Sequence, residues 1–182
     1  TWTGRLLSLV KSGGKMTLAV DGPCGQPLRI DDFQRVVLVA GGIGVTPCAS
    51  IYSFLKGRHD VSASLLWCVR ENDLAHAFVR HFARNSVKGV GESNVKIFFT
   101  QGAGNASYGA AALSTSDGPV LSEEVQAHSS RPNLRAEIAS AMGEFDGDQV
   151  LVFVCGPEAL AADARNIAKE LNAHFHQETF FL

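Results

Sequence analysis

The residues most able to do chemistry in this sequence form a glycine-rich turn, Gly41-Gly42-Ile43-Gly44-Val45-Thr46-Pro47. Glycines between a strand and a helix let the backbone approach a pyrophosphate, and the helix then offers unpaired N–H groups and a positive dipole end. Thr46 suits the N-cap of that helix, and Pro47 suits its first position. Because Pro47 replaces the third glycine of a GxGxxG fingerprint, a plain strand-to-helix turn stays open as the alternative.

The elements that must position this turn alternate between short apolar runs and helical patterns. Continuous apolar runs of five or six residues are typical of strands buried on both faces. Such strands are expected at 36–40, 64–69, 95–99 and 150–154, with a last strand within 174–182. Helices are expected at 47–55, from Asp73 through 82, at 134–142 and at 158–171. The alternation predicts an α/β fold with a doubly wound parallel sheet.

Two stretches depart from this alternation. Residues 102–130 are rich in Gly, Ala and Ser without a period, so we expect a mobile surface insertion outside the core. Before Arg35, Met16-Thr17-Leu18-Ala19-Val20 alternates like a half-buried strand and stops at Asp21-Gly22-Pro23. We interpret residues 1–33 as the C-terminal remnant of a preceding β-domain and residues 34–182 as one nucleotide-binding domain.

Composition excludes several classes of function. The 182 residues carry 16 Lys+Arg against 18 Asp+Glu, and 46% of them are hydrophobic. This balance suits a globular core and gives no footprint for nucleic acid. No apolar run approaches the ~20 residues that span a bilayer, so the chain as given is expected to be soluble. The cysteines are scattered and are expected to be reduced thiols, and His174 and His176 lack a third ligand, so no metal site is expected.

Five segments together resemble one family. Gly42-Ile43-Gly44-Val45-Thr46-Pro47 resembles the nicotinamide-nucleotide motif of the ferredoxin–NADP reductase superfamily, and most closely that of membrane ferric reductases and NADPH oxidases. Four more segments match in order and spacing: the linker Asp21-Gly22-Pro23-Cys24-Gly25, the strand end Trp67-Cys68-Val69-Arg70-Glu71, the loop Arg131-Pro132-Asn133 and the CGPE segment Cys155-Gly156-Pro157-Glu158-Ala159-Leu160. Ser130 stands where that loop usually has glycine.

The resemblance implies an NADPH site along the carboxyl ends of the strands. Gly42, Gly44 and Thr46 would hold the pyrophosphate, and Arg70 and Arg131 would meet the 2′-phosphate. The full implied set that binds cofactor is Gly42, Gly44, Val45, Thr46, Pro47, Arg70, Thr100, Gln101, Arg131, Pro132, Cys155, Gly156, Pro157, Glu158 and Phe180. Ion pairs of Arg70 with Glu71 and of Arg131 with Glu137 stay open as alternatives.

The residues implied in hydride transfer are Cys155, Glu178 and Phe180. Cys155 would lie beside the nicotinamide, Glu178 near the hydride path, and Phe180 would stack on the flavin. Because the chain continues through Phe181-Leu182, Phe181 is an alternative stacking ring. Simple packing of Cys155 and of the terminal aromatic residues also stays open.

The implied parent protein is an integral membrane flavocytochrome, with the plasma membrane as the expected location and this domain on the cytosolic face. It would pass a hydride from NADPH, held by residues 34–182, to FAD. The FAD would be mostly bound by an upstream β-barrel lobe, of which residues 1–33 would be the C-terminal remnant. Electrons would then pass through haems of a membrane domain to ferric chelates. The Phe181-Leu182 extension favours ferric reductase over a superoxide-producing NADPH oxidase. A soluble flavoreductase and a non-catalytic nucleotide-sensing module also stay open.

Overall fold

A computed structural model of the chain describes residues 2–15, 17, 19, 28–70, 72–84, 94–100, 114–115, 118–119 and 125–179. The order of elements is α1 (Trp2–Lys11), β1 (Arg35–Gly41), α2 (Val45–Leu55), β2 (Ser62–Val69), α3 (Asn72–Arg84), β3 (Asn94–Phe99), β4 (Ser114–Thr115), β5 (Gly118–Pro119), β6 (Val125–His128), α4 (Leu134–Met142), β7 (Val150–Cys155), α5 (Glu158–Glu170) and β8 (His174–Glu178). Short 3-10 turns cover Gly42–Gly44 and Gly147–Gln149.

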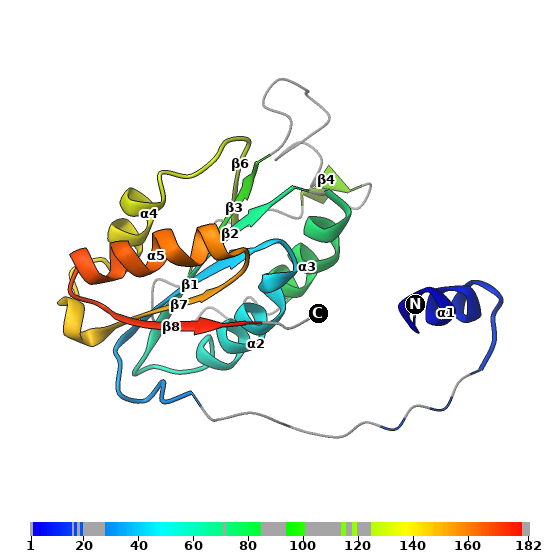
Figure 1. Cartoon of the computed structure of the whole chain (residues 1–182), viewed down its shortest axis with the longest axis horizontal. Coiled ribbons are helices and arrows are strands. Elements are labelled where there is room, and N and C mark those ends of the chain that lie inside the picture. The colour runs from blue at the N-terminus through cyan, green and yellow to red at the C-terminus, as the bar shows by residue number, and fades with distance from the viewer. Residues whose placement is uncertain are drawn as a thin grey trace.

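Six of the strands form one parallel sheet in the order β6-β3-β2-β1-β7-β8 (Figure 1). Every residue of β1 and of β7 is buried, as expected for strands covered on both faces. At the edge, β8 is only partly buried. The predicted doubly wound parallel sheet is confirmed, and the four predicted internal strands match β1, β2, β3 and β7 to within two residues at each end.

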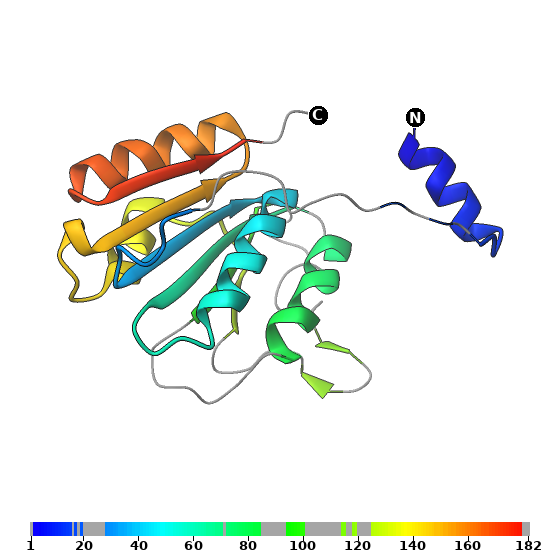
Figure 2. The same cartoon turned by 90° about the horizontal axis from the view of Figure 1, so that it is seen from below.

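Helices cover both faces of the sheet (Figure 2). Alternate residues of β1 point to opposite sides, so that Val36, Leu38 and Ala40 join one core cluster and Val37 and Val39 join the other. The first cluster includes residues of α2 and α3, and the second includes residues of α4 and α5. Burial on two faces therefore fixes the register of β1, because a slip of one residue would exchange the two sets.

The order of the strands reverses beside β1. The chain builds outward from β1 through β2, β3 and β6, and then returns to place β7 and β8 on the other side of β1. The carboxyl ends of β1 and β7 are in register, with Ala40 opposite Cys155. In open α/β sheets ligands bind at such a switch point, outside the carboxyl ends of the strands.

The structure corrects two of our expectations about the peripheral segments. The expected insertion at 102–130 is too long, because Val125–His128 forms β6, pairs with β3 in parallel and buries Val125. The sequence analysis also did not predict α1, which buries none of its residues. The strand expected at 16–20 and the linker at 21–25 lie largely or wholly outside the described residues, so the boundary at residue 33 stays a prediction.

Candidate functional site

Two loops from neighbouring strands touch backbone to backbone at the switch point. A Cβ atom added at Gly44 would fall on the carbonyl oxygen of Cys155, 2.6 Å from its carbonyl carbon and 3.1 Å from the nitrogen of Gly156. One added at Gly41 would lie 2.6 Å from Cδ of Pro157. These glycines are therefore required by the contact between the two loops. The predicted pyrophosphate-binding turn and the predicted hydride-transfer loop form one unit.

Gly42 is required for a different reason. Its φ of +55° lies in the left-handed region that side chains disfavour, and nothing lies within 4 Å of an added Cβ. Its carbonyl accepts hydrogen bonds from Val45 N–H and from Trp67 Nε1, the latter at 3.0 Å. The Thr46 hydroxyl donates to the carbonyl of Ile43 at 2.8 Å. The turn thus has open space beside Gly42, and the carbonyls of Gly42 and Ile43 both accept hydrogen bonds from other residues of the chain.

The helix after this turn begins earlier than the sequence predicts. The 3-10 turn Gly42–Gly44 leads directly into α2, whose N-cap is Gly44 and whose first residue is Val45. Thr46 and Pro47 are consequently the second and third helical residues, so the predicted N-cap role of Thr46 is wrong. Pro47 is still tolerated because first-turn N–H groups have no partner within the helix.

Cys155 and Glu178 are brought together as residue partners on adjacent strands. β7 and β8 pair in parallel with Cys155 opposite Glu178, and Cys155 is buried. Burial raises the pKa of the Cys155 thiol, and the charge of Glu178 raises it further. Cys155 is therefore a neutral thiol near neutral pH. Phe180 and Phe181 lie outside the described residues, so the assignment of a stacking ring stays a prediction.

Arg70 follows β2, and Arg131 lies in the loop after β6, with β3 between these two strands in the sheet. Arg70 is exposed directly after β2, and the N–H of Thr100 bonds the Val69 carbonyl across to β2 at 2.9 Å. Burial raises the pKa of the Cys68 thiol to about 11, and the charge of Arg131 acts in the opposite direction. The positive charge of Arg131 thus favours ionisation of the Cys68 thiol, which places Arg131 near the end of β2.

Of the two ion pairs that would explain these arginines without a ligand, the described residues bear on the pair of Arg131 with Glu137 only. Glu137 forms its ion pair with Lys96 instead, at 2.7 Å between Nζ and Oε2. The alternative of an Arg131–Glu137 pair is therefore not favoured. Glu71 lies outside the described residues, as does the predicted cofactor residue Gln101.

The remaining predicted residues lie at helix starts beside the site. Glu158 begins α5, and its Oε2 accepts from Gln177 Nε2 of β8 at 3.3 Å. Pro132 precedes Asn133, whose side chain caps α4 by accepting from Ala136 N–H at 3.2 Å. The loop at 131–133 is thus held to the start of α4.

Sequence reasoning missed the bond of Trp67 to the glycine turn and the contact that His128 makes near the end of a neighbouring part of the sheet. His128 ends β6 and stacks on Phe98 with ring centroids 4.9 Å apart. Its Nε2 is buried and has no hydrogen-bond partner in the described part of the chain. Both residues lie near strand ends in the sequence, but no local pattern reveals a bond or stacking contact with a residue 25 or more positions away.

Buried thiols make the stability of the fold fall at alkaline pH. Burial raises the pKa of Cys48 well above the usual 9.0, and the charge of Cys155 adds to the shift. Above pH 9 the unfolded chain releases thiol protons that the folded chain retains, so the free energy of unfolding falls as pH rises. Denaturation in urea at pH 7.5, 9 and 10 should show this loss.

A Cys48→Ala variant is the matched control for the pH series. It should be less stable at pH 7.5, because it leaves a small cavity. Between pH 9 and 10 it should lose less stability than the wild type, by up to about 1.4 kcal/mol per pH unit. Parallel curves for the two proteins would contradict the assignment of the alkaline loss to Cys48.

The described residues also limit other interpretations of the site. Cys48, Cys68 and Cys155 are free thiols, which confirms the prediction for three of the four cysteines, and Cys24 lies outside the described residues. Within the described ranges, no three His, Cys, Asp or Glu side chains gather as a metal site would require. Nor does any described helix have the length and apolar character to cross a membrane.

The fold and the paired loops define a nucleotide-binding domain of the ferredoxin-reductase type. The family described as "Ferric reductase NAD binding domain" matches residues 33–169 of the chain. The chain belongs to this family, as its five segments predict. It therefore carries the NAD(P)-binding domain of an oxidoreductase family.

Two curated relatives are similar over most of the chain. A heavy chain of the superoxide-generating NADPH oxidase of Dictyostelium discoideum is 26% identical over 96% of this chain and 28% of its own length. The ferric reductase transmembrane component 5 of Saccharomyces cerevisiae is 28% identical over 91% of this chain and 25% of its own length. The chain thus spans about a quarter of the length of these relatives.

Solved structures share the fold. A ferredoxin NADP+ reductase of Neisseria gonorrhoeae with bound FAD and NADP matches 84% of this chain and 58% of its own with a TM-score of 0.55 at 14% identity. The FAD/NAD-binding domain of a Vibrio cholerae nitric oxide dioxygenase matches 89% of this chain and 55% of its own, with a TM-score of 0.51 at 16% identity. At these identities the likeness shows the fold alone.

Proposed function

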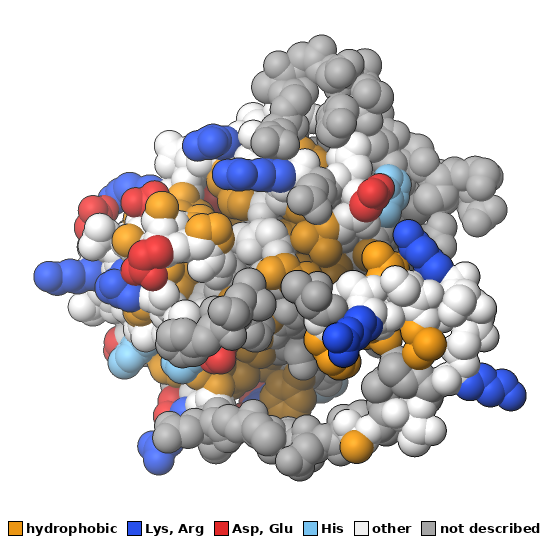
Figure 3. Space-filling view, turned by 45° about the vertical axis from the view of Figure 1, so that its right-hand side comes forward, with side chains coloured by type: hydrophobic (Ala, Val, Ile, Leu, Met, Phe, Trp, Pro, Cys, Tyr) orange, Lys and Arg blue, Asp and Glu red, His pale blue; other side chains and the backbone are white. Residues whose placement is uncertain are grey.

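We propose that this chain is the NADPH-binding part of a larger flavoprotein, and that it holds NADPH for hydride transfer to FAD. The observation that carries the proposal is the backbone contact between the turn at Gly44 and the loop at Cys155, at the switch point of the sheet. Figure 3 turns the right-hand side of Figure 1 toward the reader. On that side apolar side chains reach the surface among Lys and Arg, Asp and Glu, and His side chains.

The residues present fit a dinucleotide. The open side of Gly42 leaves room for phosphate beside the backbone, and the start of α2 supplies N–H groups. Arg70 and Arg131 extend the site toward β2 and would bind the 2′-phosphate, with Thr100 beside the adenosine half. When bound, NADPH supplies the hydride and FAD accepts it. Cys155 and Glu178 shape the place of the nicotinamide, the thiol remaining neutral and buried.

The parent protein is proposed to be an integral membrane flavocytochrome with this domain on the cytosolic face, at the plasma membrane. An upstream lobe would hold most of the FAD, and a membrane domain would carry haem. The electron acceptor is proposed to be a ferric chelate, with oxygen as the second candidate. The two curated relatives support one acceptor each, because one is a ferric reductase component and the other generates superoxide.

The proposal is tested by calorimetric titration of the chain with NADPH and with NADH. NADPH should bind more tightly, because a guanidinium–phosphate pair adds charge-assisted hydrogen bonds that NADH lacks. Arg131→Ala should weaken NADPH binding by about tenfold or more and leave NADH binding within about twofold.

Arg135→Ala is the matched control. Arg135 lies on α4, is 61% exposed and pairs with Glu170 at 3.1 Å, so its loss should leave both affinities unchanged. Equal binding of both nucleotides, independent of Arg131, would overturn the NADPH assignment. Binding without any hydride transfer in the full parent chain would instead favour the nucleotide-sensing module.

A further inference from the structure

The buried side chain of Trp67 lies directly beneath the glycine turn. Trp67 is fully buried in β2 and has Ala40, the residue that precedes the turn, as its neighbour in register. Its Nε1 donates to the carbonyl of Gly42 at 3.0 Å. A buried indole N–H needs an acceptor, and here a backbone group 25 residues away in sequence supplies it.

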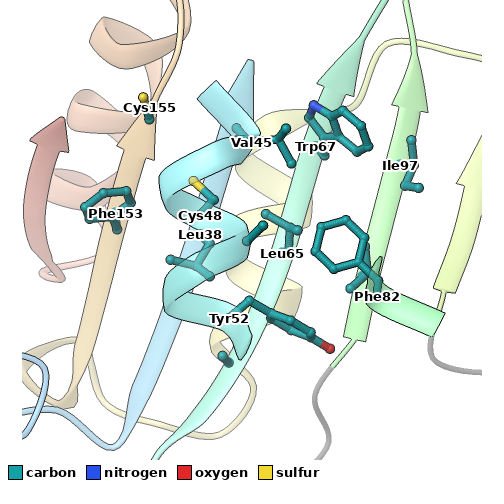
Figure 4. Packing of buried hydrophobic residues seen from close by; sticks show 14 of the residues in the cluster. Leu38, Val45, Cys48, Tyr52, Leu65, Trp67, Phe82, Ile97, Phe153 and Cys155 are labelled. Atoms are coloured by element: carbon teal, nitrogen blue, oxygen red, sulfur yellow. The ribbon is translucent and has the colours of Figure 1, made fainter. Parts of the chain in front are cut away.

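Packing from α3 fixes the direction of this donor. The rings of Phe78 and Phe82 meet the indole edge to face, with centroids 5.9 Å and 6.5 Å away. Tyr52 of α2 in turn packs against Phe82 at 5.9 Å. Figure 4 shows the indole nitrogen of Trp67 on the side that faces Val45, at the start of α2. The indole that carries the donor is therefore packed among aromatic side chains of α2 and α3.

Holding the Gly42 carbonyl also orients the next N–H group. The peptide unit that joins Gly42 to Ile43 is planar and trans, so its C=O and N–H bonds point in opposite directions. Because the carbonyl points at the buried indole, the Ile43 N–H points away from it. Ile43 itself is 56% exposed, so the residue that carries this N–H lies at the surface.

We propose that Trp67 is a positioning residue that aims the Ile43 N–H at the pyrophosphate of the bound dinucleotide. This inference rests on the proposed function. By bonding the Gly42 carbonyl, the indole also keeps a negative dipole end turned away from the phosphates. Without it, the Val45 N–H alone would hold the Gly42 carbonyl, and the orientation of the Gly42–Ile43 peptide would be less fixed, because glycine restricts rotation least.

The test compares Trp67→Phe with the wild type, using NADPH and adenosine 2′-monophosphate in calorimetry on the full chain. The second ligand keeps the 2′-phosphate and lacks the pyrophosphate. Trp67→Phe should weaken NADPH binding by about fivefold, the effect of one neutral hydrogen bond, and leave the monophosphate within about twofold. Phe82→Leu is the control, because it thins the packing on the same indole and keeps its donor.

Several outcomes would overturn the inference. They are equal loss for both ligands, equal loss in Phe82→Leu, and unchanged NADPH binding in Trp67→Phe. If the wild type itself does not bind NADPH, the proposed function fails first.

A second readout does not depend on the variant folding. The Ile43 amide resonance of the wild type should shift when inorganic pyrophosphate or NADPH is added, and an unmoved resonance would overturn the inference on its own.

Discussion

A Gly44→Ala variant is expected to be at least about 3 kcal/mol less stable than the wild type, or not to fold at all. The added methyl group would fall on the carbonyl oxygen of Cys155. Because both sides of this contact are backbone, no side chain can rotate to make room. The turn after β1 and the loop after β7 would have to move apart, and this would disturb the contact between β1 and β7 at the switch point.

The expected loss of stability comes from steric overlap and not from the backbone conformation of Gly44. Gly44 has φ −58° and ψ −7°, which alanine adopts readily. Gly57→Ala is the matched control, because nothing lies within 4 Å of its added Cβ, and it should change stability by less than about 0.5 kcal/mol. Urea denaturation of both variants decides the point. A Gly44→Ala protein as stable as Gly57→Ala would show that the loops do not meet as described.

Any folded fraction of Gly44→Ala should bind NADPH more weakly as well. The displaced turn carries the N–H groups of Ile43 and of the first turn of α2. Gly42→Ala offers the contrast, because its side chain would point into open space and its cost is the left-handed backbone, about 1 kcal/mol.

The fold was largely predictable, because its signals are local. The apolar runs at 36–40 and 150–154 are long enough to mark buried parallel strands, and they became β1 and β7. β6 was missed because Val125–His128 is short, carries one strongly buried residue, and follows a stretch of Gly, Ala and Ser. Its place depends on pairing with β3, which is a tertiary effect.

The sequence names positions for the site, which stay predictions, and it does not show how the loops that carry them contact one another. Glycines at the turn were expected to make room for a ligand, and the structure shows that Gly44 makes room for Cys155. Thr46 was predicted as the N-cap because its residue type and position fit. The 3-10 turn before it makes α2 begin at Val45, so that Gly44 is the N-cap. Contacts between loops far apart in sequence decide both points, and no single segment contains them.

The second large loss of stability is expected in Arg35→Ala, at the amino ends of the strands. Arg35 begins β1 and is 6% exposed. Its guanidinium donates to the carbonyl of Ala141 at 2.6 Å, to Ser62 Oγ at 3.0 Å and to Ser64 Oγ at 2.6 Å. It thus joins β1 to β2 and to the end of α4.

Removing this side chain should lower the free energy of unfolding by about 3 kcal/mol or more. The Ser64 hydroxyl is fully buried, so the variant leaves it and the Ala141 carbonyl without these donors, in addition to the cavity. Arg135→Ala is again the control, because an exposed ion pair contributes about 0–1 kcal/mol. Thermal and urea unfolding of the two variants measure the difference.

The position of Arg35 predicts which property changes. It lies at the amino end of β1, whereas the glycine turn follows the carboxyl end of the same strand. At a temperature where Arg35→Ala is still folded, its NADPH affinity should therefore equal that of the wild type. Gly44→Ala should lose both stability and affinity. A loss of NADPH affinity in folded Arg35→Ala would contradict this separation. It would mean that the hydrogen bonds of Arg35 hold the strand register on which the glycine turn depends.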